Sequence, residues 1–254
     1  MSADEVRPEL KHLLKHHDQS QLWFQLAEIV EDRTYLRHGI TVEPGDVVID
    51  AGANVGVAAA FFLAECGAGE VYSFEPVPEV HEMLVSNLAG FPGARTFAAG
   101  LSSRNGDAEF TYYRGAAAMS SQYADSQRDH DMVKSVLIGM GVSEQEAEAR
   151  IEGDFEPVSV TCRLATLSSV IEAESIDRID LLKIDVERAE LDVLEGIDVA
   201  HWPRIRQVVA EVHDDGDRLV QIRSLLARHG FETVTDQEDN MKSTGVHVLY
   251  ASRR

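Results

Sequence analysis

The sequence predicts a doubly wound α/β fold, in which a mainly parallel sheet carries helices on both faces. Three observations support this. Short apolar runs alternate with helical patterns, the run at 47–49 is continuous, and a bend of small residues joins that run to a helix. Continuous apolar runs are typical of parallel strands that are buried on both faces. Repeated strand-then-helix units imply right-handed crossovers within one sheet.

Residues 1–40 are predicted to form a helical extension before the sheet. Leu22, Leu26 and Ile29 recur at helical spacing within residues 21–31. Gly39 is expected to end this stretch, and the extension would then pack on the core or cover the functional site. Residues 1–18 are polar and contain no apolar segment of the kind found in secretory signals, so no such signal is expected.

Residues 41–254 are predicted to form one domain around the sheet. A turn at 44–46 precedes the first strand. Further strands are expected at 70–74, 95–99, 179–184 and 208–212, and helices at 58–65, 79–88, 189–194 and 217–228. Residues 109–113 are expected to add an antiparallel strand, and residues 231–235 and 246–251 to close the chain as a hairpin.

Residues 115–157 interrupt this alternation and are predicted to form a helical insertion. Val133, Val136 and Leu137 follow a helical pattern, and Ser143 with Glu146 forms a capping signal for a second helix. An insertion of this length in a compact core commonly covers or recognises a ligand, so a lid is predicted. The alternative is a helical pair that only decorates the fold or joins two copies of the chain as a homodimer.

The composition argues against several classes of protein. The formal net charge is −21, with 44 acidic against 23 basic residues. A surface that follows phosphates needs clustered Lys and Arg, so neither nucleic acid nor an anionic membrane is an expected partner. No apolar run reaches the roughly 20 residues that cross a bilayer. Cys66 and Cys162 form no Cys-x-x-Cys pair, so a disulfide framework or zinc site is not expected, and a cytoplasmic location is.

The bend after the first strand indicates a ligand that contains adenosine but no pyrophosphate. It reads Asp50-Ala51-Gly52-Ala53-Asn54-Val55-Gly56. Small residues let the backbone approach a ligand at the start of a helix. The dinucleotide pattern G-x-G-x-x-G is not met, because Asn54 and Val57 replace glycine. An acid at the end of the first strand can meet the cationic amino group of a sulfonium-bearing amino acid.

Glu75 supports the same reading, because it ends the next strand, where an acid can accept both hydroxyls of a ribose. The alternative is a tight turn followed by a solvated acid.

Four segments resemble the FkbM family of methyltransferases. They are residues 47–56 (VVIDAGANVG), 74–76 (FEP), 182–190 (LKIDVERAE) and 209–213 (VAEVH), of which the third is the most specific. The likeness runs from about Val42 to the C-terminus and is interrupted by residues 115–157. The family usually has Gly where this chain has Arg188, a departure that concerns the local backbone and the substrate side more than the cofactor site.

The resemblance implies a class I methyltransferase fold, Rossmann-like with a reversed last strand, and S-adenosylmethionine as methyl donor. It also implies transfer to a hydroxyl of a small natural product, a sugar or a carrier-bound intermediate. The first bend would then line the methionine portion, Glu75 the ribose, and the end of the third strand the adenine. The expected cofactor residues are Asp50, Ala51, Gly52, Ala53, Asn54, Gly56, Glu75, Pro76, Leu101, Ser102 and Asp185.

The expected catalytic residues are Asp185, Glu187, Glu211 and His213. They follow two neighbouring strands, and the i, i+2 spacing within each pair places both side chains on one face. Transfer to an alcohol requires alignment and removal of a proton. His213 is the first candidate for the base because imidazole titrates near neutral pH, with Asp185 or Glu211 orienting it.

Asp185, Glu211 and His213 also offer an O/O/N set for Mg²⁺ or Mn²⁺. The alternative roles of these residues are cofactor positioning, helix capping and a histidine satisfied by backbone.

Three other functions stay open at this point. An NAD-dependent oxidoreductase would share Glu75 but require glycine at positions 54 and 57. An amino-directed nucleic-acid methyltransferase would carry Asp/Asn-Pro-Pro-aromatic where this chain reads Asp185-Val186-Glu187-Arg188. A non-catalytic binding or assembly module would keep the fold and bind an adenosine ligand without turnover.

Overall fold

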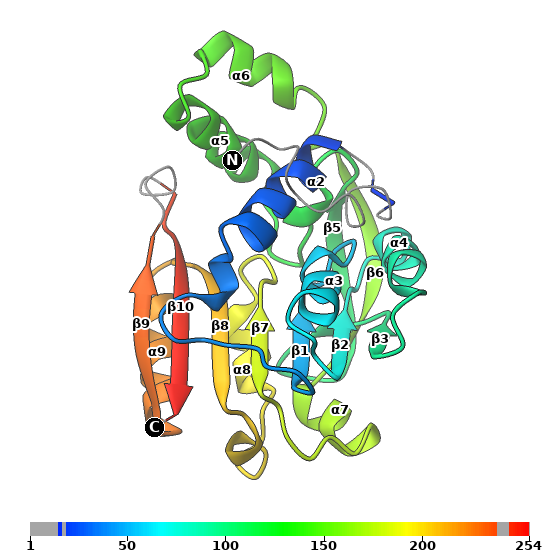
Figure 1. The fold of residues 1–254 in the computed structure, drawn as a ribbon. Helices are drawn as coiled ribbons and strands as arrows, with labels where there is room; N and C mark the ends of the chain where they lie inside the picture. Colours follow the sequence, from blue (N-terminus) through cyan, green and yellow to red (C-terminus); the bar gives the residue numbers. More distant parts are fainter. Residues whose placement is uncertain (1–14, 17–18, 238–243, 254) are drawn as a thin grey trace.

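The computed structural model describes residues 15–16, 19–237 and 244–253, so the expectations for residues 1–14 and 17–18 lie outside the described residues. Its centre is a seven-stranded sheet with the order β3-β2-β1-β7-β8-β10-β9 (Figure 1). The strands are β1 (Val47–Ala51), β2 (Glu70–Phe74), β3 (Ala94–Phe97), β7 (Leu181–Ile184), β8 (Gln207–His213), β9 (Phe231–Asp236) and β10 (Val246–Arg253). Neighbouring strands from β3 to β8 pair in parallel, whereas β10 is antiparallel to both β8 and β9. The reversed last strand is therefore confirmed.

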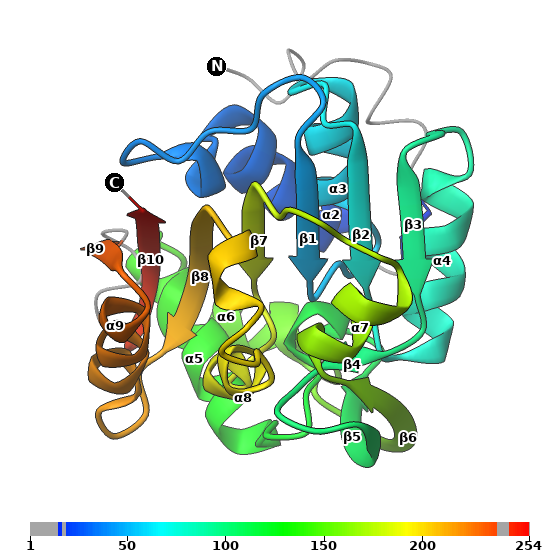
Figure 2. The same cartoon turned by 90° about the horizontal axis from the view of Figure 1, so that it is seen from below.

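Helices cover both faces of the sheet, as predicted (Figure 2). On one face lie α3 (Val57–Ala64) and α4 (Pro78–Leu88), and on the other α7 (Leu167–Ala173), α8 (Glu190–Glu195) and α9 (Arg218–Arg228). Val48 and Ile49 on β1 are both fully buried and point into opposite cores. Burial of each such side chain contributes roughly 1.5–3 kcal/mol to the stability of the folded protein. This two-sided burial explains why β1 begins with a continuous apolar run, and the doubly wound fold is confirmed.

The N-terminal extension packs on the face that carries α3. It consists of α2 (Gln19–Gln25), a π-helical segment (Leu26–Glu31) and a short 3-10 turn (Thr34–Leu36). Leu22, Leu26 and Ile29 are buried in the core with α3. The helix ends at Glu31 rather than at the expected Gly39, because Arg33 adopts a left-handed conformation (φ 50°) that breaks the helix before Tyr35.

A second, three-stranded sheet has the order β4-β6-β5. Its strands are β4 (Gly100–Leu101), β5 (Gly106–Tyr113) and β6 (Pro157–Ala165). The antiparallel strand expected at 109–113 lies within β5, but it pairs with β6 in this separate sheet. No strand was predicted at 157–165, because most of β6 is exposed and only Cys162 and Leu164 give it an alternating buried face.

The insertion contains the two helices that the sequence predicts, α5 (Ser126–Gly139) and α6 (Glu144–Ile151). The Ser143 side chain accepts a hydrogen bond from the Glu146 N–H (3.3 Å), which confirms the capping signal. A small core formed by Tyr113, Ile151 and Phe155 joins the insertion to β5. Among the residues that the structure describes, none of the helices combines the length and apolarity that a membrane crossing needs.

Candidate active site

A cavity of about 740 Å³ lies beyond the carboxyl ends of β1, β2, β7 and β8. From β1 the chain adds β2 and β3 on one side of the sheet, and it later adds β7 and β8 on the other side. The order of the strands therefore reverses between β1 and β7. Such a switch point opens a crevice that binds ligands in α/β proteins. The volume is within the range of small-molecule sites. One side of the cavity carries the bend after β1 and Glu75, and the opposite side carries α5 and α2.

The bend after β1 is held by close backbone packing. Gly52 has φ 77°, and a Cβ atom at this position would lie 1.7 Å from the backbone oxygen of Asp185. The N–H groups of Gly52 and Ala53 both donate to the carbonyl of Phe74, at 3.1 and 2.9 Å. Glycine is therefore required at position 52, where the β1 and β7 loops nearly touch and face the cavity.

Glu75 stands at the end of β2 as expected and is buried in the cavity wall. Its two carboxylate oxygens accept hydrogen bonds from the N–H groups of Asn54 (3.1 Å) and Val77 (2.9 Å). Burial nevertheless raises the pKa of Glu75 to about 7, because desolvation of the carboxylate outweighs these two bonds. The group is fixed in position and ready to accept further hydrogen bonds.

The expected cofactor residues divide into two groups. Those on the cavity wall are Gly52, Ala53, Asn54, Glu75, Pro76, Leu101 and Asp185. Those beneath it are Asp50, Ala51, Gly56 and Ser102, which are outside the lining. Asp50 is fully buried below the bend. Gly56 begins α3, and a Cβ there would lie 2.8 Å from Leu84 Cδ1, so this glycine allows α3 and α4 to pack.

Lys183 is a buried cation to which sequence analysis assigned no role. Its Nζ lies 3.0 Å from Asp50 Oδ1 and 3.5 Å from Asp185 Oδ2, and it donates to the carbonyl of Gly52 (2.8 Å). Burial opposes its charge, but Asp50 and Asp185 outweigh burial and raise the pKa of Lys183. A single charged residue within the apolar run of β7 was the available signal, because a buried charge requires a partner.

Asp185 is oriented by the N-terminal extension. The hydroxyl of Tyr35 donates to Asp185 Oδ2 at 2.9 Å, and the Tyr35 ring lies beside Lys183 Nζ, 5.3 Å from the ring centroid. Burial and then the charge of Asp185 raise the pKa of Tyr35 well above its usual value. Tyr35 therefore stays a hydrogen-bond donor and ties the extension to the cavity floor.

His213 differs from the free base that the sequence suggested. Its Nδ1 lies 2.9 Å from Glu190 Oε1 and its Nε2 lies 3.1 Å from Glu187 Oε2. Burial opposes protonation, but Glu187 and Glu190 outweigh it and hold the pKa of His213 well above 6.5. Both ring nitrogens thus lie beside carboxylates, which favours the protonated form of His213 over that of a free base.

Glu211 is a further carboxylate on the cavity wall. Burial raises the pKa of Glu211 well above its usual value, and the negative charges of Asp185 and Glu28 raise it further. The wall thus gathers more negative charge than Lys183 and His213 neutralise, and it favours a cationic ligand or a bound proton.

Three side chains also lie close enough together to bind a metal ion, and one of them differs from the expected ligands. Ligand atoms of Glu187, Glu211 and His213 lie within 4.8 Å of one another. Asp185 was expected in place of Glu187, but its carboxylate is engaged by Tyr35 and Lys183. His213 fits as a ligand only if its Nε2 exchanges a proton for the metal.

The remaining wall of the cavity is largely apolar and comes from segments outside the main sheet. It includes Phe24 from α2 and residues of the insertion, namely Met119, Met132, Val133, Val136, Leu137, Met140, Ile151 and Phe155. The sequence predicted the insertion but not these individual contacts. The site therefore has a polar part at the strand ends and an apolar chamber beside it.

The sheet order, its reversed last strand and the position of the cavity define a Rossmann-like methyltransferase. The family model for the methyltransferase FkbM domain matches residues 50–233. The 31-O-demethyl-FK506 methyltransferase FkbM of Streptomyces tacrolimicus is 36% identical over 94% of this chain and 92% of its own length. The chain therefore belongs to the FkbM family of methyltransferases, as the resemblance predicted.

Two further similar proteins are longer than this chain. AMB antimetabolite synthetase AmbE of Pseudomonas aeruginosa is 36% identical over 89% of this chain, which corresponds to 11% of that protein. The crystal structure of methyltransferase FkbM from Methylobacillus flagellatus KT superposes with a TM-score of 0.52 at 12% identity, covering 96% of this chain and 57% of that one. The second likeness concerns the fold alone.

Proposed function

We propose that this protein is an S-adenosylmethionine-dependent O-methyltransferase that acts on a hydroxyl of a small natural product, a sugar or a carrier-bound intermediate. One observation carries the proposal. The bend at Gly52 and the carboxylate of Glu75 line the same cavity as the acidic groups Glu187 and Glu211. A site for an adenosine-bearing donor and a site for proton removal thus share one enclosed space.

The residues fit the donor. Gly52 leaves no room for a side chain between the bend and the β7 loop, and Glu75 is a buried carboxylate at the place of a ribose. Gly52, Ala53 and Asn54 would hold the methionine portion and Leu101 the adenine. When bound, this cofactor supplies an electrophilic methyl group on a sulfonium. The surplus negative charge of the wall is complementary to that cation.

The acidic residues would have two roles, removal of the acceptor's proton and maintenance of the geometry of the site. Glu211 is our candidate for the group that takes the proton of the acceptor, because it lines the cavity and its raised pKa makes it a stronger base than an ordinary carboxylate. Glu187 is held by His213, and Asp185 by Tyr35. These contacts preserve the geometry while a proton moves, and the apolar wall from the insertion excludes water.

Three observations support this class of acceptor. The name of the S. tacrolimicus relative denotes methylation of an O-demethyl compound, which favours oxygen as the acceptor atom. The apolar chamber formed by α2 and the insertion favours an acceptor with an extended apolar part. AmbE carries the matching region inside a synthetase, which agrees with an acceptor that is still being assembled on a carrier.

A divalent cation is the second candidate for activating the acceptor hydroxyl. The grouping of Glu187, Glu211 and His213 favours it, and bound Mg²⁺ would lower the pKa of a coordinated hydroxyl. The contacts of both His213 nitrogens with carboxylates make direct proton removal by Glu211 the first candidate.

The test combines binding and turnover. Calorimetry should show S-adenosylhomocysteine binding and no NADH binding. With 31-O-demethyl-FK506 and a panel of hydroxylated acceptors, mass spectrometry should detect a methylated product. Glu211→Gln should lower kcat by about 10²–10⁴-fold and leave S-adenosylhomocysteine affinity unchanged, whereas Glu195→Gln, at an exposed position of α8, should match the wild type. Absence of S-adenosylhomocysteine binding would overturn the proposal.

A further inference from the structure

A buried ion pair joins the insertion to the loop that follows β7. Arg188 Nη2 donates to Asp129 Oδ1 at 2.6 Å, and both side chains are almost inaccessible to solvent, at 4% and 0% exposure. Asp129 also accepts from the Tyr113 hydroxyl and the Asp125 N–H, each at 3.0 Å. Asp129 thus links α5 to β5 through Tyr113 and to the loop after β7 through Arg188.

The backbone at Arg188 is unfavourable for an arginine. Glu187 and Arg188 have φ values of 50° and 74°, the left-handed region that glycine occupies without steric penalty. A non-glycine residue persists in this conformation only when its surroundings determine it. In this chain the buried bond to Asp129 supplies that constraint.

The same loop is bonded to the insertion and to the acidic groups of the site. Ser121 Oγ, from the start of the insertion, donates to the carbonyl of Glu187. The N–H of Arg188 donates to Glu190 Oε1 (2.8 Å), which also contacts His213 Nδ1 (2.9 Å). A displacement of the loop would therefore move the groups that hold the Glu187 carboxylate.

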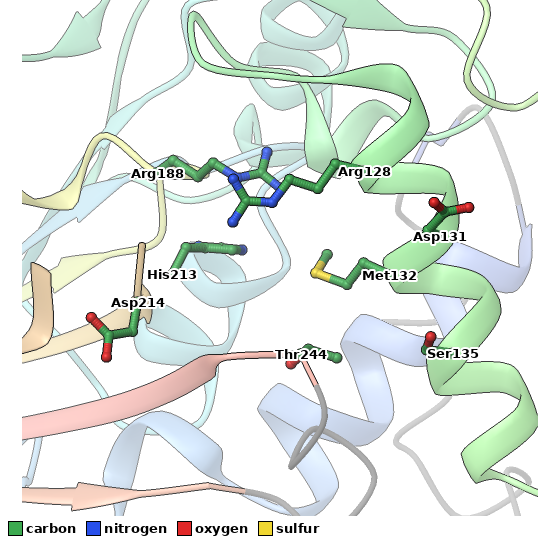
Figure 3. Close-up of a pocket in the computed structure, with 8 residues that line it drawn as sticks. All are labelled: Arg128, Asp131, Met132, Ser135, Arg188, His213, Asp214 and Thr244. Atoms are coloured by element: carbon green, nitrogen blue, oxygen red, sulfur yellow. The ribbon is translucent and has the colours of Figure 1, made fainter. Parts of the chain in front are cut away.

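The ion pair borders a second, smaller cavity of about 190 Å³ between α5 and the ends of β8 and β10. Figure 3 shows Arg188 and Arg128 reaching into it from opposite sides, with His213 beside them. Both arginines form ion pairs with Asp215. Met132 and His213 line this cavity and the main one, so the pair lies where α5 meets the active site.

We propose that Arg188 is a positioning residue. Its bond to Asp129 holds α5 against the main cavity, and thereby sets the apolar acceptor wall and the contact between Glu187 and His213. The role in the acceptor site rests on the function proposed above, whereas the role in holding the insertion does not.

The test compares Arg188→Met and Asp129→Asn with a double variant, Arg188→Met/Asp129→Leu. Hydrogen exchange of the α5 and α6 amides is measured on the apo protein and needs neither cofactor nor acceptor. Loss of one member of a buried pair should accelerate this exchange by about 10²-fold or more. The apolar double variant should recover part of the protection, because it leaves no unpaired buried charge, although the Tyr113 hydroxyl and the Asp125 N–H lose their acceptor. Lys134→Gln, which breaks exposed ion pairs with Glu144 and Glu148 inside the insertion, is the matched control.

Kinetics separate positioning from general damage. Each single variant should keep the wild-type affinity for S-adenosylhomocysteine and lose kcat/KM for the acceptor, and the double variant should regain part of it. Exchange rates equal to those of Lys134→Gln in both single variants would overturn the proposal. Loss of S-adenosylhomocysteine affinity in Asp129→Asn, the mildest change, would overturn it as well, because the pair would then serve the cofactor side.

Discussion

Glu75→Gln should stabilise the protein at alkaline pH while weakening cofactor binding. The folded protein holds Glu75 with a pKa of about 7, against an ordinary value of 4.5. A pKa that folding raises contributes stability below the unfolded value and loses it as the pH rises through the folded one. The ionised, buried carboxylate therefore opposes folding above pH 7, and an uncharged isostere removes that opposition.

The size of the effect follows from the pKa values. A rise from 4.5 to about 7 corresponds to roughly 3 kcal/mol of destabilisation of the ionised apo protein. Glutamine has one carbonyl oxygen for the two N–H donors, Asn54 and Val77, and losing one neutral bond costs about 1 kcal/mol. We expect a net gain of about 2 kcal/mol in the free energy of unfolding at pH 8, and no gain at pH 4.5.

Urea unfolding of the wild type and the variant at both pH values measures this difference. Calorimetry should show S-adenosylhomocysteine affinity reduced by about 10–100-fold, the loss of charge-assisted bonds to the ligand. Glu82→Gln, an exposed glutamate on α4, is the control and should change neither quantity. A variant that is less stable than the wild type at pH 8, or that binds the ligand with unchanged affinity, would refute the reasoning.

Two other predictions concern the same cavity. Gly52→Ala should abolish S-adenosylhomocysteine binding in calorimetry and lower the unfolding midpoint in urea. The added Cβ would lie 1.7 Å from the Asp185 backbone oxygen, and the φ of 77° is strained for alanine. Wild-type binding by this variant would contradict the geometry of the bend. Dialysis against EDTA should leave turnover unchanged if Glu211 removes the proton directly, so a loss of turnover that Mg²⁺ restores would favour the metal set of Glu187, Glu211 and His213 instead.

Features that depend on residues close together along the chain could be predicted from the sequence. The continuous apolar run of β1 follows from burial on both faces, and the Gly52 bend and Glu75 follow from the order of strand, turn and helix. The capped helix at Ser143 is equally local. The edge strand β6 escaped prediction because most of its residues are exposed, and an exposed strand has little apolar periodicity.

The charges at the site could not be assigned in the same way. Sequence spacing brought Asp185, Glu187, Glu211 and His213 to the ends of neighbouring strands, and all four line the cavity. The spacing could not show that both nitrogens of His213 lie beside carboxylates, which favour the cationic form of the ring over the expected base. The protonation state of a buried group depends on all charges within several ångströms of it, including those from other elements.

The chain by itself determined the fold class, the family, the bend after β1 and the location of the acidic groups, because each depends on periodicity or on a contiguous motif. Tertiary structure alone decided the partners: Tyr35 with Asp185 across 150 positions, Asp129 with Arg188 across 59, and Glu190 with His213 across 23. The physical reason is that an ion pair or hydrogen bond requires approach to within a few ångströms, and between distant segments only the packing of helices on the sheet sets that distance.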